Sequence, residues 1–231
     1  MNQPHQNDVA SFFDSISVQY DGMIERCVPR YREMIWALLT YLPKQLEVSR
    51  ILELGCGTGN LSSVLAQRFP QAEITMVDIS SEMLENCRQR LGQDSRFTFR
   101  VADFNNLDFD AASFDLVTSS IAIHHINSAA KAALFQRVHS WLREDGVFAY
   151  SDQFAGATTE LYQTHLEFWR SEALKLGATD DDWNVWMQHQ DDADFHDPLI
   201  DQIDWLRAAG FQNVDCPWRF LLWTVVLAQK S

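Results

Sequence analysis

The stretch ILELGCGTGN, residues 51–60, decides the fold of this 231-residue chain. An apolar run that contains the acid Glu53 leads directly into Gly55, Gly57 and Gly59 on alternate positions. A glycine-rich turn after a strand is typical of a site for a nucleotide-like ligand, because the missing Cβ lets the backbone approach the ligand. The stretch alone does not separate a nicotinamide dinucleotide from another adenosine-containing ligand.

Strands and helices alternate downstream of this turn. The expected strands are 50–54, 73–77, 96–101, 114–119 and 146–151, and the expected helices are 59–69, one that begins at Ser80 or Ser81 with Ser81 as its cap, and 128–142. Strands that alternate with helices of this length predict a parallel sheet covered on both faces. Two β-rich segments, 212–217 and 220–228, close the chain, and a reversed last strand would form a hairpin at the sheet edge.

Helical segments flank the alternating core. Helical spacing is found in 9–25, 29–42, 158–176 and 198–209. Between the last two lies the acidic stretch ATDDDWNVWMQHQDDAD at 178–194, whose carboxylates we expect to be solvated loop and cap residues. We expect one domain, 1–231, divided into N-terminal cap helices (1–47), a cofactor-binding core (48–152), a helical lid (153–197), and the last helix with the closing strands (198–231).

Composition limits the partners and the compartment. The formal net charge is −14 and the 18 Lys and Arg residues form no basic run, which argues against a nucleic-acid partner. Four cysteines far apart in the sequence, without a CxxC pair, favour a reduced, cytoplasmic protein. The N-terminus lacks the pattern of a signal peptide, and no stretch approaches about 20 uninterrupted apolar residues, so we expect no membrane span. Nothing in the sequence indicates the oligomeric state.

Acids and histidines follow the predicted strands. Asp78 follows the second strand, Asp103 the third, and His124 and His125 the fourth. In open α/β sheets, ligands bind beyond the carboxyl ends of the strands. Asp78 lies 19 residues beyond Gly59, at the distance from which an acid reaches a ribose.

The spacing of the glycines distinguishes two kinds of ligand. A dinucleotide fold prefers G-x-G-x-x-G, but this chain has Asn60 at the last position of that motif. A pyrophosphate also needs an uncluttered anion site at the helix N-terminus. Glu53, Asp78 and Asp103 suit a positively charged ligand instead, such as S-adenosylmethionine, which has a sulfonium and an ammonium and no phosphate. A nicotinamide dehydrogenase is therefore a distant alternative.

Successive motifs resemble those of the class I S-adenosylmethionine-dependent methyltransferases. These motifs are ILELGCGTGN, VDIS with Met83, VADF, FDLVTSSIAIHHI and WLREDGVFAYSD, and they cover nearly the whole chain. The resemblance implies an α/β, Rossmann-like fold: a mostly parallel seven-stranded sheet with a terminal antiparallel hairpin, N-terminal helices and a helical lid over the site. It also implies S-adenosyl-L-methionine as the cofactor.

The same resemblance implies roles for individual residues. The glycines would flank the methionine moiety, Asp78 would accept from the ribose hydroxyls, and Asp103 would accept from the adenine amino group. Ile79 and Met83 would pack on the adenine. The expected cofactor-binding residues are Tyr20, Glu53, Gly55, Gly57, Gly59, Asp78, Ile79, Met83, Asp103, Phe104 and Ser120. The alternative for each acid is a helix cap or a solvated loop end.

The N-terminal segment FFDSISVQYDGMIERCVPRY resembles a subgroup of this family. That subgroup contains the bacterial carboxy-S-adenosylmethionine synthases, which act in tRNA wobble-uridine modification. Those synthases hold the extra carboxylate with an arginine in the helix before a terminal AGF. Aligned on residues 209–211, that position is Trp205 here, with Arg207 nearby. A neutral indole cannot pair with a carboxylate, which favours ordinary methyl transfer.

His124 and His125 are the candidate catalytic residues. Either could act as a base or orient the acceptor, and the alternative is a capping or buried histidine. His165, His189 and His196 are scattered in the sequence, so no metal site is expected.

Trp183 and Trp186 lie in the acidic stretch at 178–194. They could form an aromatic acceptor pocket, or they could pack in the core between the lid helices and the sheet.

Our leading interpretation is a cytoplasmic S-adenosylmethionine-dependent methyltransferase that moves a methyl group to a small-molecule acceptor by in-line displacement. The alternatives are an enzyme similar to the carboxy-S-adenosylmethionine synthases and an S-adenosylmethionine-binding protein without turnover. The sequence does not identify the acceptor or the element that is methylated.

Overall fold

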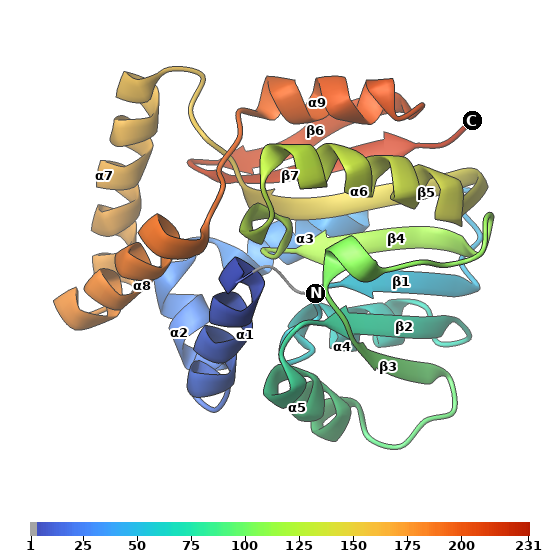
Figure 1. The fold of residues 1–231 in the computed structure, drawn as a ribbon, viewed down its shortest axis with the longest axis horizontal. Coiled ribbons are helices and arrows are strands. Elements are labelled where there is room, and N and C mark those ends of the chain that lie inside the picture. Colours follow the sequence, from blue (N-terminus) through green and yellow to red (C-terminus); the bar gives the residue numbers. More distant parts are fainter. Residues whose placement is uncertain (1–3) are drawn as a thin grey trace.

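A mixed sheet with helices on both faces forms the body of the molecule (Figure 1). The computed structural model describes residues 4–231. The strands are β1 (Arg50–Leu54), β2 (Glu73–Asp78), β3 (Phe97–Val101), β4 (Phe114–Ser120), β5 (Leu142–Gln153), β6 (Gln212–Phe220) and β7 (Trp223–Gln229). The helices are α1 (Pro4–Ile16), α2 (Tyr20–Cys27), α3 (Tyr31–Thr40), α4 (Asn60–Arg68), α5 (Ser81–Leu91), α6 (Ser128–Trp141), α7 (Thr159–Lys175), α8 (Asp180–Ala193) and α9 (Leu199–Ala208), with 3-10 turns η1 (Phe104–Asn106) and η2 (Ile123–His125).

The strand order is β3-β2-β1-β4-β5-β7-β6. Neighbouring strands from β3 to β5 are parallel, and β7 runs antiparallel to both β5 and β6. The predicted Rossmann-like sheet with its closing hairpin is therefore confirmed. The chain proceeds from β1 outward to β3 and returns to β4 on the other side of β1. This reversal is the place where such sheets bind ligands.

The two faces of the sheet carry separate apolar clusters. Ile51 packs on one face with residues of α3, α4 and α5, whereas Leu52 and Leu54 pack on the other with residues of α6 and α9. Burial of both faces of the sheet explains why β1 carries apolar side chains on both of its faces. Since side chains alternate along a strand, Glu53 shares the face of Ile51 and is only 1% exposed.

A group of four helices, α1, α2, α7 and α8, lies at the carboxyl ends of the central strands (left of Figure 1). Trp169 of α7 is fully buried there and packs edge-to-face on Trp183 and on Trp223 of β7. Its Nε1 donates a hydrogen bond of 2.5 Å to the carbonyl of Cys27. Trp186 is 5% exposed and belongs to the core, and Trp183 is partly buried against the same apolar cluster, so neither lines an open aromatic pocket.

Three local expectations differ from the structure. The predicted helix 9–25 is two helices, α1 and α2, separated by a turn. The cap of α5 is Ser80 and not Ser81, because the Ser80 Oγ accepts from the Met83 amide at 3.0 Å. The acidic stretch at 178–194 forms helix α8, which begins with a capping box of Thr179 and Asp182.

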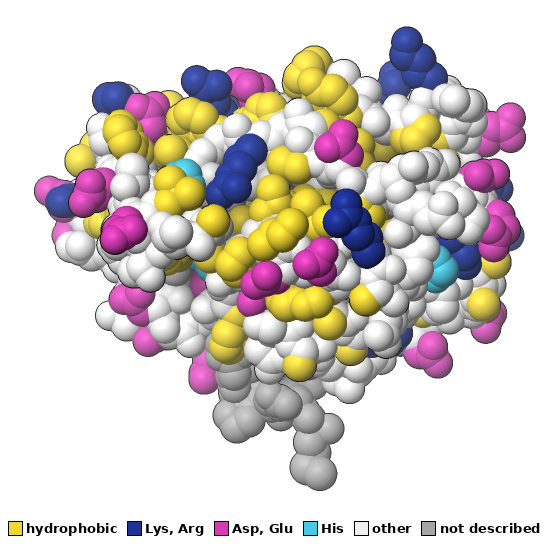
Figure 2. All heavy atoms as spheres, turned by 90° about the horizontal axis from the view of Figure 1, so that it is seen from above, with side chains coloured by type: hydrophobic (Ala, Val, Ile, Leu, Met, Phe, Trp, Pro, Cys, Tyr) yellow, Lys and Arg dark blue, Asp and Glu magenta, His cyan; other side chains and the backbone are white. Residues whose placement is uncertain are grey.

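Basic side chains are spread over the surface. In the view of Figure 2, Lys and Arg side chains stand apart from one another, between acidic and apolar ones. Throughout residues 4–231, no helix has both the length and the apolar character needed to cross a bilayer.

Candidate active site

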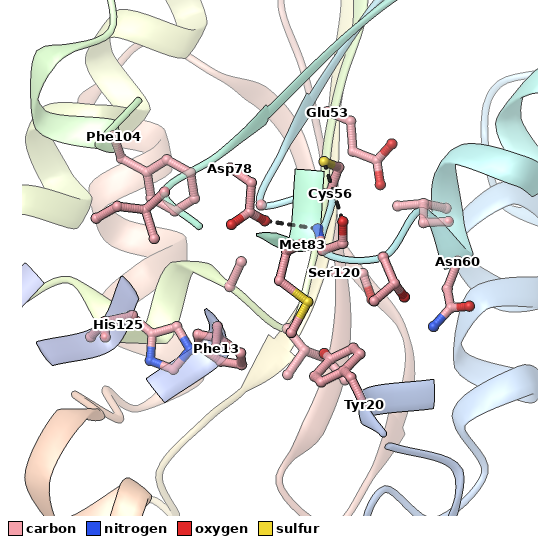
Figure 3. Close-up of a pocket in the computed structure, with 18 of the residues that line it drawn as sticks. Phe13, Tyr20, Glu53, Cys56, Asn60, Asp78, Met83, Phe104, Ser120 and His125 are labelled. Atoms are coloured by element: carbon pink, nitrogen blue, oxygen red, sulfur yellow. Dashed lines mark hydrogen bonds between the residues drawn. The ribbon is translucent and has the colours of Figure 1, made fainter. Parts of the chain in front are cut away.

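A pocket opens at the carboxyl ends of β1, β2 and β4, beneath α1 and α2 (Figure 3). The space free of protein atoms between its walls, open mouth included, is about 740 Å³. The residues expected at the cofactor that line it are Tyr20, Glu53, Gly55, Gly57, Asp78, Ile79, Met83, Phe104 and Ser120. His125 lines it too.

The turn after β1 needs its glycines for two different reasons. Gly55 has φ +70°, and a Cβ at this position would lie 2.2 Å from the Cβ of Ala122. Gly59 has φ +87°, and its Cβ would lie 2.8 Å from the Cys87 Sγ. Gly55 therefore allows close approach at the pocket wall. Gly59 lies behind that wall, where it allows the start of α4 to pack on α5.

Asp78 lies at the end of β2 and links two backbone segments of the pocket. Its Oδ2 accepts from the Gly57 amide at 2.8 Å, and its Oδ1 accepts from the Ser80 amide at 2.9 Å. Burial raises the pKa of this carboxyl, and the two amides offset part of that effect. The carboxylate is thereby oriented between the glycine turn and the N-terminus of α5.

Glu53 is a second buried carboxyl in the pocket wall. Its Oε2 accepts from the Ser62 hydroxyl of α4 at 2.6 Å. Burial raises the pKa of Glu53 well above its usual value, and the nearby Cys87 and Asp78 raise it further, whereas the hydrogen bond from Ser62 lowers it. A cation in the pocket would favour the ionised form of this group.

Asp103 is buried but is not among the residues that line the pocket. Its Oδ1 accepts from the backbone amide and the side-chain amide of Asn105, at 2.8 and 3.0 Å. Asp103 therefore caps η1. A helix cap is the alternative role that the sequence allows for each of these acids. The neighbouring Phe104 faces the pocket instead.

Several lining residues were not identified from the sequence. Phe13 comes from α1, Tyr31 from α3 and Asn60 from α4. The Asn60 side chain and the Thr58 hydroxyl both donate to Asp21 of α2, at 3.1 and 2.6 Å. These bonds attach α2 to the glycine turn. No local sequence pattern predicts this contact.

The two candidate catalytic histidines have different surroundings. His125 lines the pocket, and its Nδ1 lies 3.0 Å from Asp194 Oδ1. His124 lies deeper, with its Nδ1 in contact with Asp152 Oδ1 and its backbone amide donating to Asp152 Oδ2 at 3.0 Å. Burial and the neighbouring His125 lower the pKa of His124. His125 therefore faces the pocket, with His124 behind it.

Asp194 gathers further histidines, contrary to the expectation from the sequence. His189 Nε2 lies 3.9 Å from Asp194 Oδ1, and His196 Nε2 lies 3.5 Å from Asp194 Oδ2. Of the three histidines taken as scattered, only His165 stays apart from this group, beside Arg219. The Asp194 side chain is 3% exposed, so the view of it as a solvated loop residue was wrong.

The neighbouring histidines lower the pKa of Asp194. Burial alone would raise the pKa of this carboxyl, but His124, His125 and His196 outweigh it and hold the pKa well below the usual value. Burial lowers the pKa of His189 to about 3. Burial thus disfavours the charged forms of His124 and His189, while Asp194 beside them favours its ionised form.

Comparisons with known proteins agree with this geometry. The family described as a methyltransferase domain matches residues 51–146. The carboxy-S-adenosyl-L-methionine synthase of Helicobacter pylori strain P12 is 22% identical, over 95% of this chain and 94% of its own length. The malonyl-[acyl-carrier protein] O-methyltransferase of Geobacter sulfurreducens is 35% identical, over 53% of this chain and 44% of its own length.

A solved structure has the same fold. Phosphoethanolamine N-methyltransferase 2 of Haemonchus contortus, in complex with S-adenosyl-L-methionine, superposes on 94% of this chain with a TM-score of 0.70 and 18% identity. The chain spans 57% of that protein. Residues 51–146 thus match the methyltransferase-domain family, the fold is that of the class I S-adenosylmethionine-dependent methyltransferases, and these similarities together support S-adenosyl-L-methionine as the cofactor.

Proposed function

We propose that this enzyme transfers the methyl group of S-adenosylmethionine to a small-molecule acceptor held between the cofactor and His125. A lone pair of the acceptor atom attacks the methyl carbon while the carbon–sulfur bond breaks, and S-adenosylhomocysteine leaves. Such a displacement depends mainly on positioning. The proposal rests on one observation above all: the pocket that contains Asp78 and Glu53 also contains His125.

The proposed cofactor contacts follow from the pocket wall. Asp78 would accept from the ribose hydroxyls, and Ile79 and Met83 would pack on the adenine beside Phe104. Glu53 would face the positively charged methionine end. Gly55 and Gly57 bring the backbone close to this end of the ligand.

His125 is the proposed contact of the acceptor. Where the acceptor atom carries a proton, the pair of His125 and Asp194 can take it, because a carboxylate beside Nδ1 stabilises the imidazolium that forms when the ring accepts a proton. His124, which Asp152 holds, would position its neighbour. Free cysteines and the acidic surface are consistent with a cytoplasmic enzyme that acts on a small molecule.

A screen of metabolite extracts with S-adenosylmethionine labelled on its methyl group tests the function. We expect a labelled product with the native chain, and a rate lower by about 10² or more with His125→Ala, the contribution of a general base. His165→Ala, a histidine outside the cluster, is the matched control and should retain the rate. The absence of labelled product from every acceptor fraction would refute methyl transfer to a small molecule, and full activity of His125→Ala would remove this residue from the mechanism.

A second candidate, synthesis of a carboxylated cofactor, is favoured by the similarity to the Helicobacter pylori synthase over 95% of the chain. The contacts of α9 argue against it. Trp205 packs against the apolar cluster that includes Leu206, and Arg207 is exposed, 3.7 Å from Asp204. Mass spectrometry of the nucleoside that co-purifies with the protein separates the two, because an extra carboxylate on it would favour the synthase.

Glu53→Gln should separate cofactor binding from stability. We expect S-adenosylmethionine to bind roughly tenfold or more weakly, because the substitution removes the negative charge that would face the methionine end of the cofactor. The hydrogen bond from the Ser62 hydroxyl can be kept by the glutamine oxygen. The raised pKa of Glu53 means that its folded form favours the protonated state. Its contribution to stability is therefore largest below the unfolded pKa and is lost as pH rises through the folded pKa.

The free Glu53→Gln protein should accordingly be at least as stable as the native one at pH 8, and its advantage should shrink toward pH 5. Calorimetric titration and thermal unfolding at the two pH values measure both effects. Normal affinity of Glu53→Gln for S-adenosylmethionine would contradict this account. So would a variant that is less stable than the native protein at pH 8 but not at pH 5.

A further inference from the structure

The cluster around Asp194 has a geometry that methyl transfer does not require. We propose that His124, His125 and Asp194 bind a divalent transition-metal ion of the zinc type, at the acceptor end of the pocket. His124 Nε2, His125 Nδ1 and the Asp194 carboxylate contribute atoms that all lie within 4.8 Å of one another. The three side chains are 3–9% exposed.

The distances around Asp194 match a shared ion better than a set of hydrogen bonds. The oxygen-to-nitrogen separations are 3.0 Å to His125, 3.6 Å to His124, 3.5 Å to His196 and 3.9 Å to His189. Only the first is within the usual range for a hydrogen bond. Ligand atoms about 2.0–2.1 Å from a tetrahedral ion lie about 3.3 Å from each other, which is close to the middle of the observed values.

The surroundings of His124 direct a lone pair at Asp194. A carboxylate only accepts hydrogen bonds, so Asp152 requires the proton of neutral His124 on Nδ1. The Nε2 atom then carries a lone pair, and it faces Asp194 Oδ1 at 3.6 Å. A positive charge between two such facing acceptors, carried by a proton or by a metal ion, would stabilise them in a buried site. A carboxylate that holds the far nitrogen of a histidine is the usual outer partner of a metal ligand.

Two further imidazole nitrogens are available for a fourth ligand position. The Nε2 atoms of His189 and His196 are buried without a hydrogen-bond partner among residues 4–231. The Nδ1 of His196 lies 2.6 Å from the Tyr162 hydroxyl, which fixes the ring with Nε2 toward Asp194. Buried polar atoms without partners are rare in folded proteins, and an ion is one explanation for them.

The backbone on both sides of Asp194 is fixed before any ion binds. The Phe195 amide donates to the His124 carbonyl at 2.7 Å, which connects the end of α8 to η2. Lys131 of α6 donates to the Phe195 carbonyl and, at 2.6 Å, to Asp197 Oδ2. Residues about 70 positions apart in the sequence are thus held in a fixed arrangement, as a metal site requires.

The donor set indicates the type of ion. Imidazole nitrogens with one carboxylate suit zinc and neighbouring transition metals, whereas magnesium and calcium prefer oxygen ligands. An ion at this position would replace the proton between His125 and Asp194. With the ion bound, the cluster would act on the acceptor as a Lewis acid in place of the base formed by His125 and Asp194. This extension rests on the proposed function, whereas binding of the ion does not.

Titration of the chelator-treated, untagged chain with Co²⁺ and Zn²⁺ tests the site, in the absence of cofactor and acceptor. We expect one ion per chain, visible d–d absorption for Co²⁺, and a higher unfolding temperature with Zn²⁺. Asp194→Asn should bind at least about tenfold more weakly, and the matched control Asp191→Asn, an exposed acid near the end of α8, should bind as the native chain does.

Two results would overturn the metal site. One is a native chain without a cobalt spectrum and without a shift in unfolding temperature. The other is an Asp194→Asn variant that binds as tightly as Asp191→Asn. His125→Gln, also measured by circular dichroism and by affinity for S-adenosylmethionine, separates loss of the ion from loss of the fold. Because no methyl transfer is measured, failure of the metal site leaves the proposed function standing, and failure of methyl transfer leaves the metal site standing.

Discussion

Gly55→Ala is expected to abolish measurable S-adenosylmethionine binding and to destabilise the protein by more than any other single change in the glycine turn. The left-handed φ of +70° costs a residue with a Cβ about 1–2 kcal/mol. Overlap with the Ala122 Cβ, 2.2 Å away, adds about 1–3 kcal/mol of overpacking. The turn can relieve this overlap only by moving away from η2, which deforms the pocket wall. Calorimetric titration and chemical unfolding measure the two effects.

Gly92→Ala is the matched control for this prediction. Gly92 has nearly the same φ, +74°, and an added Cβ would have no atom within 4 Å. This variant should therefore lose only the conformational term, about 1–3 kcal/mol for φ +74° with ψ −170°, and should bind the cofactor normally. Equal loss of stability in the two variants, or normal binding by Gly55→Ala, would show that close approach at Gly55 does not shape the site.

Asp78→Ala is expected to weaken S-adenosylmethionine binding by roughly 1.5–3 kcal/mol, or about 10- to 150-fold in affinity. The variant removes the proposed acceptor of the ribose hydroxyls. It also releases the Gly57 amide, which Asp78 holds at 2.8 Å, so the glycine turn loses part of its fixed shape. Isothermal titration calorimetry gives the affinity, and the intact fold can be checked by circular dichroism.

Asp115→Ala provides the comparison for Asp78→Ala. Asp115 is also buried, but it lies at the amino end of β4, where its Oδ2 accepts from the Ser49 and Arg50 amides at 2.6 and 2.9 Å. Its loss should lower the unfolding temperature and leave the cofactor affinity unchanged. An unchanged affinity in Asp78→Ala would exclude this residue from the cofactor site, and equal affinity losses in both variants would point to a general loss of stability.

The sheet and the cofactor side of the site could be predicted because their signals are local. β1, β2 and β4 each contain an apolar run followed by a turn, and Asp78 is the last residue of β2. The carboxyl ends of parallel strands meet at one edge of the sheet, so these positions converge without any knowledge of packing. Asp103 shows the limit of this reasoning, because its position after β3 fits both a ligand contact and the cap of η1.

The cluster at Asp194 could not be predicted because its members come together only through tertiary packing. His124 and Asp194 are 70 residues apart, and the contact depends on how α8 docks beside η2. In the sequence, Asp194 is one of several acids in a run, and such runs are commonly solvated. Its burial follows from Lys131 and the backbone of Phe195, neither of which carries a local signal.

The indole of Trp169 joins three distant parts of the chain: the carbonyl at the end of α2, the helix α7 itself, and Trp223 of β7. Exchange of α7 for a helix of another protein would leave the Cys27 carbonyl and Trp223 without this indole. We therefore expect chimeric chains to fold only when α2, α7 and β7 come from the same parent.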